Sequence, residues 1–290
     1  MAKAAVEAPT MFHHSIVRAA ASGRSDRFKL KVAQSPLDRA SGFDYRAWND
    51  LLRAEYIIGN CGCRPNDVDV NTTKKPAGKS LRSDAPISRR DAIQAVSWLK
   101  KNFAKQIAAA VEGTHYSVDH VCGIACQETA YFWLRLIDKL SVEDVCARCV
   151  LDASGDAPNT TRNAFPRDTK AFRKEYGDER TDALIEEVNK TRELRGYSRK
   201  NWVYKGYGLF QYDLQFVRVD PDFFFEKQWY CFDACLERVM RELHGTWARH
   251  GSIFEAIRAY NGAGNRAAVY AENVMAYSGF AGDVSETMLA

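Results

Sequence analysis

One carboxylate lies inside a short apolar and aromatic stretch of the chain. Residues 124–133 read IACQETAYFW, and Glu128 is the acid among them. An apolar setting disfavours the charged form of a carboxyl group, which raises its pKa and lets it hold a proton near neutral pH. A group of that kind can act as a general acid. The alternative is that Glu128 faces solvent or makes a salt bridge in the core.

A second segment combines glycines with polar side chains. In KGYGLFQYD, residues 205–213, the two glycines permit a tight turn with close backbone approach. Gln211 and Asp213 project on alternate positions after that turn. A loop of this kind can line a groove, although an ordinary hairpin turn explains the segment equally well on its own.

A third segment, AIRAYNGAGN at residues 256–265, carries an aromatic ring beside an amide. Asn261 followed by Gly262 is typical of a helix C-terminus, with Tyr260 packing in the last turn. This structural explanation is sufficient for the segment alone. It does not explain why the segment occurs in one chain with Glu128 and the glycine-rich turn.

In chain order, the three segments resemble the pattern of the lysozyme-like superfamily, in particular goose-type lysozymes and soluble lytic transglycosylases. That pattern is a Glu-Ser at the end of a core helix, then GLMQ, then AYNAG. The matching residues here are QET at 127–129, GLFQ at 208–211 and AYNG at 259–262. Goose-type members continue past GLMQ with an Asp two residues on, which Asp213 matches. The resemblance spans roughly residues 95–277, and the motifs are specific together rather than singly.

The resemblance implies a substrate and a role for each matching residue. Glu128 matches the general acid that protonates the glycosidic oxygen between N-acetylmuramic acid and N-acetylglucosamine in peptidoglycan. Asp213 matches a goose-type carboxylate that helps to position water. The resemblance implies no cofactor and no metal ion. The remaining matches imply contacts with the sugar chain, and they are Gln211, Tyr260, Asn261, Tyr207 and Thr129.

Two reactions are open within this resemblance. An inverting hydrolase needs a second carboxylate about 6.5 to 9.5 Å from the acid to activate water, and Asp213 is the candidate. A lytic transglycosylase needs none, because the deprotonated acid then acts as base while the muramoyl 6-hydroxyl attacks and leaves a 1,6-anhydro sugar. The GYGLFQYD match favours the hydrolase. Chitin or chitosan is an alternative glycan.

The chain departs from the family pattern at two places. Thr129 replaces the family's serine, which keeps the hydroxyl and adds a methyl group. Between Glu128 and Asp213 lie 84 residues, far more than goose-type lysozymes have there. We assign about residues 151–200 to an insertion that covers or reshapes the groove. Its first loop offers further sugar contacts, although ordinary turns use the same residue types. These candidates are Asp152, Ser154, Asp156 and Arg162.

Helical periodicity predicts a mainly α fold, namely a lysozyme-like helical domain with a long insertion. At most a short β-hairpin is expected, near residues 202–213. Ser88, Ser117 and Ser141 have the form of helix N-caps, and Gly262 has the form of a helix stop. We expect a short helix from Ser141 to Val150, a loop over 151–169, and a charged helix with little apolar face over 170–195. The predicted division of the chain is 1–42, a disordered basic arm; 43–87, a helix and loop extension; 88–282, the catalytic domain; and 283–290, a C-terminal tail.

The eight cysteines occur as four close pairs, and one combination suggests a metal site. Cys122, Cys126, Cys146 and Cys149 form C-x3-C-x19-C-x2-C, which is near the spacing of a zinc site. Both pairs fall in segments that we expect to be helical, where a free cysteine is usually a small buried apolar residue. A zinc-stabilised interaction protein is therefore kept as an alternative function, without metal ligands assigned.

Composition bears on partners. The net charge is +4, from 41 Lys and Arg against 37 Asp and Glu, and residues 1–40 carry that whole excess. The remainder is balanced, which argues against a nucleic-acid partner. No apolar run approaches the ~18 to 20 residues that span a bilayer, so no integral membrane segment is expected.

Localisation follows from the N-terminal residues. Arg18, Arg24 and Arg27 interrupt any continuous apolar region of a secretory signal, so we expect the chain to be made in the cytoplasm. It would then act in the periplasm or cell wall after delivery by a secretion machine or a phage lysis pathway. Secretion machinery or an immunity protein would be partners beside peptidoglycan. A further function class is a non-catalytic glycan-binding module on the same fold, its catalysis lost or occluded by the insertion.

Overall fold

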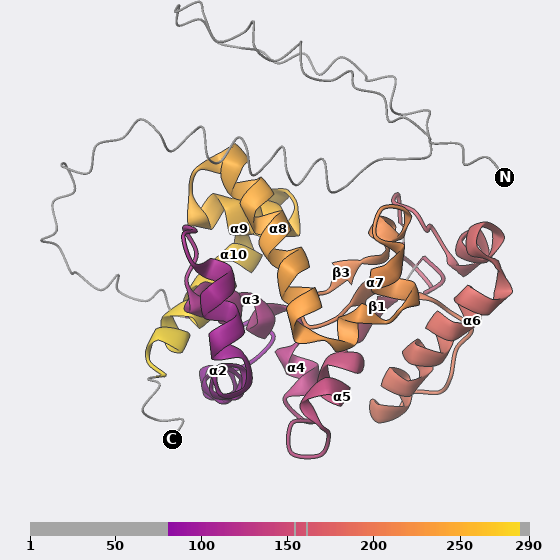
Figure 1. The fold of residues 1–290 in the computed structure, drawn as a ribbon, viewed down its shortest axis with the longest axis horizontal. Helices are drawn as coiled ribbons and strands as arrows, with labels where there is room; N and C mark the ends of the chain where they lie inside the picture. The colour runs from indigo at the N-terminus through magenta and orange to yellow at the C-terminus, as the bar shows by residue number, and fades with distance from the viewer. Residues whose placement is uncertain (1–80, 154, 161, 285–290) are drawn as a thin grey trace, which may run out of the picture. The chain divides into compact units, whose positions relative to one another are not determined.

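The described part of the chain is mainly helical, as the sequence predicts (Figure 1). The computed structural model describes residues 81–153, 155–160 and 162–284. The predictions for residues 1–80 and 285–290 lie outside this part. The helices are α2 (Arg89–Val111), α3 (Val118–Glu128), α4 (Ala130–Trp133), α5 (Val142–Ala147), α6 (Thr169–Leu194), α7 (Pro221–Phe225), α8 (Phe232–His250), α9 (Ile253–Asn261) and α10 (Gly264–Gly282), with 3-10 turns η2 (Leu214–Arg218) and η3 (Gln228–Tyr230).

Serine hydroxyls begin three of these helices where the sequence predicts. Ser88, Ser117 and Ser141 each accept a hydrogen bond from the backbone N–H three residues on, at 3.2, 3.4 and 3.1 Å. Each bond satisfies an N–H group that has no partner inside the helix. The helix that precedes Gly262 also ends at that glycine, as predicted. Capping therefore fixes the frame of the helical part from local sequence alone.

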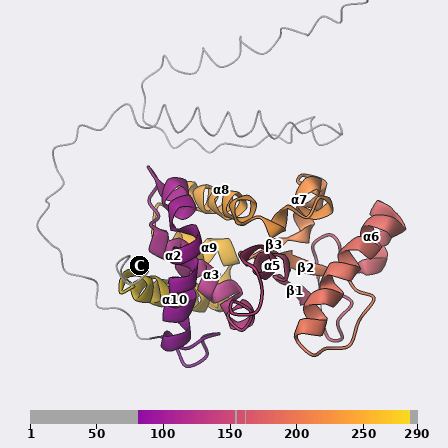
Figure 2. The same cartoon turned by 60° about the horizontal axis from the view of Figure 1, so that its bottom comes forward.

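One group of helices packs around α3. Helix α10 lies along α3, α2 contacts α3, α8 and α10, and α9 lies against α8 and α10 (Figure 1, Figure 2). Six consecutive residues of α3, Val121–Cys126, are buried, so α3 is a core helix on every side. None of the described helices is long and apolar enough to cross a membrane. The residue that ends α3 is Glu128.

A small antiparallel sheet lies between this group and α6 (Figure 1, Figure 2). Its order is β1 (Val150–Ala153), β2 (Tyr204–Tyr207) and β3 (Tyr212–Asp213), with Val150 opposite Tyr207 and Gly206 opposite Asp213. The expected hairpin is present as β2 and β3. The short helix expected after Ser141 is present as α5, but it ends at Ala147 rather than Val150. The loop expected from residue 151 begins instead with β1, which forms by pairing with a strand far along the chain.

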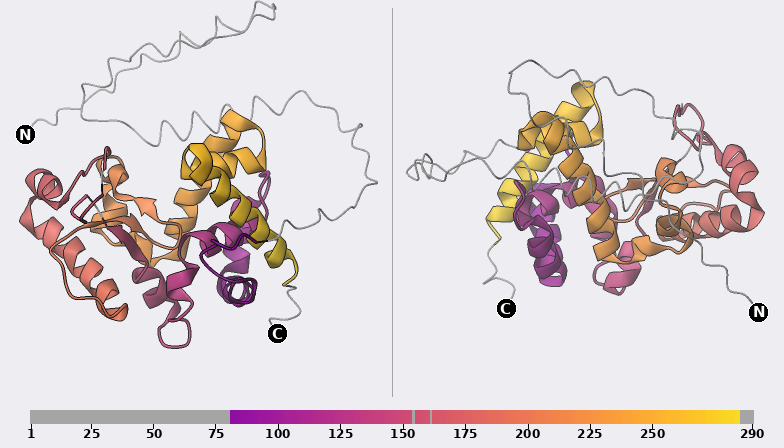
Figure 3. Two further views of the ribbon diagram at one scale, coloured as in Figure 1. Left: turned by 180° about the vertical axis from the view of Figure 1, so that it is seen from behind. Right: turned by 45° about the horizontal axis from the view of Figure 1, so that its top comes forward.

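The insertion belongs to the folded unit. Helix α6 contacts β1, β2 and α7 (Figure 3). Its backbone is interrupted at Gly177, where φ is 81°. The sequence predicts little apolar face for it, yet Phe172, Leu184, Ile185 and Val188 are buried. Packing on the sheet therefore requires only a narrow apolar stripe on an otherwise charged helix.

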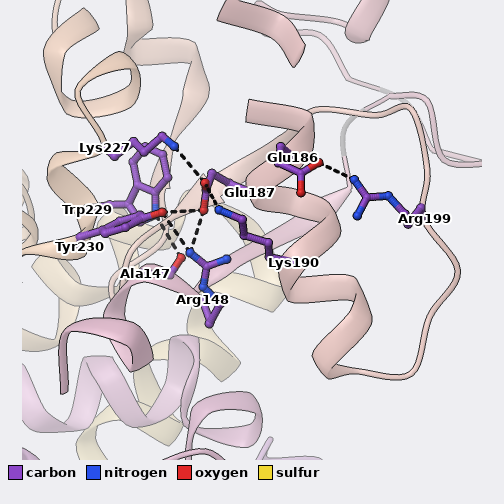
Figure 4. A network of polar contacts seen from close by, with 9 residues as sticks. All are labelled: Ala147, Arg148, Glu186, Glu187, Lys190, Arg199, Lys227, Trp229 and Tyr230. Atoms are coloured by element: carbon purple, nitrogen blue, oxygen red, sulfur yellow. Dashed lines mark hydrogen bonds and ion pairs between the residues drawn. The ribbon is translucent and has the colours of Figure 1, made fainter. Parts of the chain in front are cut away.

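A buried carboxylate ties α6 to its neighbours. Glu187 is fully buried, and its oxygens accept hydrogen bonds from Arg148 (2.7 Å), Tyr230 (2.6 Å), Lys190 (2.9 Å) and Lys227 (2.9 Å) (Figure 4). Burial alone would raise the pKa of Glu187, but these four donors outweigh it and lower the pKa to about 2. The carboxylate thus stays charged at neutral pH and holds α6 against the end of α5 and the η3 turn.

Candidate active site

Glu128 ends α3 beside α10. The side chain is half-buried, and its Oε1 atom accepts a hydrogen bond of 2.6 Å from the Tyr270 hydroxyl. Among the described residues, none forms an ion pair with Glu128. The prediction that this acid ends a core helix is confirmed. The core salt bridge considered as the alternative is absent from the described contacts.

Hydrogen bonds bring the three predicted segments together. The Thr129 hydroxyl donates to the Leu209 carbonyl at 2.8 Å, which ties the end of α3 to the glycine-rich turn. The Tyr260 hydroxyl donates to the Phe210 carbonyl at 2.8 Å, which ties the end of α9 to the same turn. The Tyr260 ring also lies 6.3 Å from that of Tyr270, centroid to centroid. Segments far apart in sequence therefore meet at one place.

The turn between β2 and β3 needs its glycines. The Gln211 amide donates to the carbonyls of Cys149 (3.1 Å) and Gly208 (2.8 Å), so its N–H groups serve the backbone. A Cβ atom on Gly206 would lie 2.2 Å from the Gln211 Oε1 atom, and one on Gly208 would lie 2.4 Å from the Cys235 Sγ atom. The close backbone approach predicted from the sequence is confirmed. Gln211 can offer a substrate only its carbonyl oxygen.

The surroundings of Glu128 favour its protonated form. Burial raises the pKa of Glu128 to about 7, since an apolar site disfavours the charged carboxylate. The negative charges of Asp152 and Glu242 act in the same direction. The Tyr270 hydrogen bond and the positive charge of Lys205 act against it. With a pKa of about 7, a large fraction of Glu128 holds its proton around neutral pH.

A second glutamate near Glu128 is not visible as a site in the sequence. Glu242 lies on α8 and is half-buried, and burial raises its pKa to about 7. The charge of Asp213 adds to that rise, and the charge of Arg241 opposes it. A single glutamate in an amphipathic helix carries no local signal of function. Its importance appears only when α8 is placed beside the end of α3.

Asp213 is engaged by the insertion. Its oxygens form an ion pair with the two terminal nitrogens of Arg162, at 2.5 and 3.3 Å. Its Oδ1 atom also accepts a hydrogen bond of 2.8 Å from the Gln215 backbone N–H. Asp213 lies close enough to Glu242 to affect that pKa, so it belongs to the same region. Both of its oxygens already have partners there.

The other candidates from the insertion separate into two groups. Asp152 pairs with Lys205 across the sheet at 3.2 Å, and both charges act on Glu128. Asp152 has a φ of 64°, in the left-handed region that Asp adopts more readily than most residues with a side chain. Asp156 instead accepts from the backbone and hydroxyl of Thr169 at 2.9 and 2.7 Å. Ser154 lies outside the described residues.

Two expected sugar contacts are corrected. Tyr207 is fully buried, with its ring centroid 4.9 Å from that of Trp229 and 5.3 Å from that of Phe224. Thr129 is also fully buried, and its hydroxyl accepts from the Trp133 indole at 3.0 Å. Neither side chain reaches the surface, since the Tyr207 ring packs among buried aromatic rings and the Thr129 hydroxyl bonds inside the core. Tyr260, half-buried, and Asn261, exposed at the end of α9, remain predicted contacts.

The cysteines do not form a metal site in the described residues. No group of three or more His, Cys, Asp or Glu side chains there is arranged to hold a metal ion. Cys122, Cys126, Cys146 and Cys149 are all buried. Burial raises the pKa of the Cys122 thiol to about 12, as expected for a small side chain packed in an apolar core. The zinc-stabilised alternative therefore has no structural support in this part of the chain.

A hollow of about 470 Å³ lies at the start of α6. None of the residues grouped around Glu128 lines it, and the Arg173 guanidinium at its edge pairs with Asp178 and Asp182 at 2.6 and 2.5 Å. The hollow is therefore separate from the candidate site. Its lining is Asp156, Thr169, Lys170, Arg173, Lys174 and Asn201.

Comparison with known proteins adds no relative. No protein-family model, no curated protein and no solved structure matches this chain. The lysozyme-like resemblance thus rests on the three motifs, and functional inference rests on the geometry around Glu128.

Proposed function

We propose that this protein has a lysozyme-like fold and cleaves the β-1,4 bond between N-acetylmuramic acid and N-acetylglucosamine in peptidoglycan, with Glu128 as general acid. One observation carries the proposal, namely the convergence of the three motif segments on this acid. Thr129 and Tyr260 tie the glycine-rich turn to the ends of α3 and α9. Tyr270 reaches Glu128 from α10. Packing alone does not require an acid at that meeting point.

The hydrogen bond to Glu128 suits proton donation. Tyr270 donates to Oε1, which leaves Oε2 to carry the acidic proton toward a substrate. A pKa of about 7 keeps much of the acid protonated at neutral pH and makes its conjugate base strong enough to take a proton back. Glu128 therefore can serve as acid in a first step and as base in a second.

The partners of Asp213 favour a transglycosylase over the hydrolase that the sequence favours. Both oxygens of Asp213 are engaged by Arg162, so a water molecule would have to compete with that ion pair to reach the carboxylate. In the proposed reaction Glu128 gives its proton to the glycosidic oxygen as the bond from that oxygen to C1 breaks. The Glu128 carboxylate then takes the proton of the muramoyl 6-hydroxyl as that oxygen bonds to C1. A hydrolase is the second candidate, with Glu242 rather than Asp213 as the base that activates water.

Product analysis tests the proposal directly. Purified sacculi are incubated with wild-type protein, with Glu128→Gln and with Glu255→Gln, and the released muropeptides are identified by mass spectrometry. Glu255 is a matched control because it lies on α9 and pairs with Arg258 at the surface. We expect 1,6-anhydro fragments from the wild type and the control and none from Glu128→Gln. Chitooligosaccharides are tested in parallel as the alternative glycan.

Each other result has a defined meaning. Reducing ends in place of anhydro ends would replace the transglycosylase by the hydrolase. Binding to sacculi without any fragments from the wild type would contradict the enzyme and favour the glycan-binding module. The substrate lies in the periplasm or cell wall, so the proposal includes delivery there by a secretion machine or a phage lysis pathway.

A further inference from the structure

Helix α6 ends in a motif that fixes the residues after it. The Tyr197 N–H donates to the Arg192 carbonyl and the Gly196 N–H to the Glu193 carbonyl, both at 2.9 Å. Gly196 has a φ of 73°, which suits a residue without Cβ. These two bonds define a Schellman motif with Arg195 as its C-cap. The backbone that presents Tyr197 is therefore set by the end of the helix.

Further contacts hold the loop that follows against α6. Arg199 pairs with Glu193 at 2.5 Å and also with Glu186, as Figure 4 shows for the second pair. The Asn189 side chain makes two hydrogen bonds with the backbone of Lys200, at 3.0 and 2.8 Å. The loop is therefore held in place while its Tyr197 side chain remains 50% exposed.

Positive side chains alternate with aromatic rings along this part of the molecule. The Arg195 guanidinium carbon lies 5.0 Å from the Tyr197 ring centroid and 5.8 Å from that of Phe132. That of Arg192 lies 5.6 Å from the Tyr197 centroid and 5.9 Å from that of Trp202. The Lys200 ammonium completes the row, 5.3 Å from the Trp202 centroid. We call this row the stacked surface, made of Arg195, Tyr197, Arg192, Trp202 and Lys200; Phe132, which also contacts Arg195, is buried.

Exposed apolar side chains gather near the stacked surface. The large apolar residues exposed in the described part are Tyr131 (36%), Leu194 (46%), Tyr197 (50%) and Val219 (44%). Three of these four lie on α4 or at the end of α6. Single exposed apolar residues are ordinary, but a group of them marks a binding surface more often than chance placement.

The stacked surface lies near the candidate active site, with Tyr131 of α4 between them. Burial raises the pKa of Tyr131, and the charges of Arg195, Asp152 and Glu128 are all close enough to act on it. Phe132 belongs to α4, which begins two residues after Glu128. Trp202 comes shortly before β2, which carries Lys205 of the site. The insertion therefore places the exposed Tyr197 ring near elements that carry the candidate active site.

The chemistry of the stacked surface suits a charged sugar polymer. An aromatic ring packs against the apolar face of a sugar ring, and a guanidinium offers planar donors to carboxylates and hydroxyls. Arg192, Arg195 and Lys200 supply three positive charges, and among the described residues no carboxylate forms an ion pair with any of them. Peptidoglycan strands carry the complementary negative charge in the carboxylates of their peptides.

We infer that the stacked surface is a second subsite, which binds the peptidoglycan strand beyond the bond being cleaved. Sugar rings of the strand pack on Tyr197, and Arg195 contacts its carboxylates. This inference rests on the proposed function, since it takes the same polymer as substrate. It gives the insertion a role in holding a long strand rather than in covering the groove.

Binding by an inactive protein tests the inference without cleavage. Glu128→Gln is the background, and co-sedimentation with purified sacculi measures affinity. Adding Tyr197→Ala is expected to weaken binding about 10-fold, and adding Arg195→Gln about 5-fold, from loss of ring and guanidinium contacts. Binding of a single disaccharide-peptide is expected to change less than about 2-fold, because it fills only the site at Glu128.

A matched control comes from another cation and ring pair. Arg218 lies 4.0 Å from the Phe165 ring centroid and pairs with Glu175, near the opposite end of α6. Arg218→Gln in the same background is expected to bind sacculi unchanged. Circular dichroism checks that every variant is folded. If Tyr197→Ala does not fold, Arg195→Gln alone tests the stacked surface.

The outcomes separate this inference from the proposed function. Unchanged sacculus binding in both variants overturns the second subsite. If the wild type still cleaves sacculi, the proposed enzymatic function is unaffected by that result. Equal losses for long strands and for the single disaccharide-peptide also overturn it, since Tyr197 would then belong to the first site. If folded Glu128→Gln binds no sacculi at all, the polymer is not the ligand and both proposals fail.

Discussion

Two glutamates of this protein have similar partners and opposite properties. Glu128 accepts a hydrogen bond of 2.6 Å from Tyr270, and Glu187 accepts one of 2.6 Å from Tyr230. Burial acts to raise the pKa of both. Yet the pKa of Glu128 rises to about 7, and that of Glu187 falls to about 2.

The difference is the number of positive charges in contact. Glu187 touches Arg148, Lys190 and Lys227, whereas no described cation forms an ion pair with Glu128. A buried carboxylate surrounded by cations is an anchor, and its charge is permanent at neutral pH. One left without cations beside other acids remains able to exchange its proton. Burial of an acid is therefore not a sign of function until its partners are known.

The largest effect is expected from removing the anchor. Glu187→Gln leaves the buried Arg148 without its counter-charge, and we expect a loss of about 3 to 5 kcal/mol in the free energy of unfolding at pH 7. Urea denaturation followed by circular dichroism measures it. Glu186→Gln is the control, since its ion pair with Arg199 is exposed to solvent and contributes little to stability.

The loss should depend on pH in a defined direction. The pKa of Glu187 is lowered from its ordinary value of 4.5 to about 2, so the native state favours the ionised form. Its stabilisation is present above about pH 4.5 and disappears as the pH falls toward 2. The difference in free energy of unfolding between wild type and Glu187→Gln should become smaller as the pH falls from about 4.5 toward 2. A difference in stability that does not change with pH would contradict a stabilising role for the ionised Glu187 carboxylate.

Replacing Glu128 should change the free energy of unfolding in the opposite direction. The pKa of Glu128 is raised from 4.5 to about 7, so the native state holds the proton that the unfolded chain releases. Between these two values the wild type loses stability as the pH rises, and above about pH 7 the loss is complete. Glu128→Gln has no such proton, so we expect it to be more stable at pH 8 by on the order of 2 kcal/mol.

The same denaturation experiment at pH 4 supplies the comparison. Both proteins then carry an uncharged side chain at position 128, and equal stability is expected. A Glu128→Gln variant that is less stable than wild type at pH 8 would show that the carboxylate is an anchor like Glu187. The two substitutions together thus show which glutamate stabilises the folded protein and which one destabilises it.

Local signals in the sequence predicted the helical frame and the acid. Ser88, Ser117 and Ser141 were identifiable because a cap acts on N–H groups a few residues away. Gly262 was identifiable for the same reason at a helix end. Glu128 stood out because its immediate neighbours are apolar and aromatic.

Contacts between residues far apart in the sequence determine the features that the sequence did not predict. Strand β1 exists because Val150 lies opposite Tyr207, and the same pairing buries Tyr207 instead of exposing it to a substrate. Glu242 and Glu187 sit in helices rich in charge, where a single glutamate has no distinguishing neighbours. Only the packing of α8 and α6 shows that one lies near Glu128 and the other among cations.

The smallest effect concerns the acidity of Glu128 itself. Tyr270→Phe removes a hydrogen bond that lowers the pKa of Glu128, and Glu242→Gln removes a negative charge that raises it. If Glu128 is the general acid, kcat declines at alkaline pH as it loses its proton. Tyr270→Phe should move that decline to higher pH and Glu242→Gln to lower pH, each by about half a pH unit, or roughly threefold in activity on the slope.

A matched tyrosine separates acidity from stability. Tyr230→Phe removes a hydrogen bond of the same 2.6 Å length, but from Glu187. It should reduce the free energy of unfolding by about 1 to 2 kcal/mol and leave the pH dependence of kcat unchanged. Shifts in the same direction for Tyr270→Phe and Glu242→Gln would contradict the electrostatic account, because one removes a stabiliser of the carboxylate and the other a repulsion. Opposite shifts, absent in Tyr230→Phe, would assign the titration to Glu128.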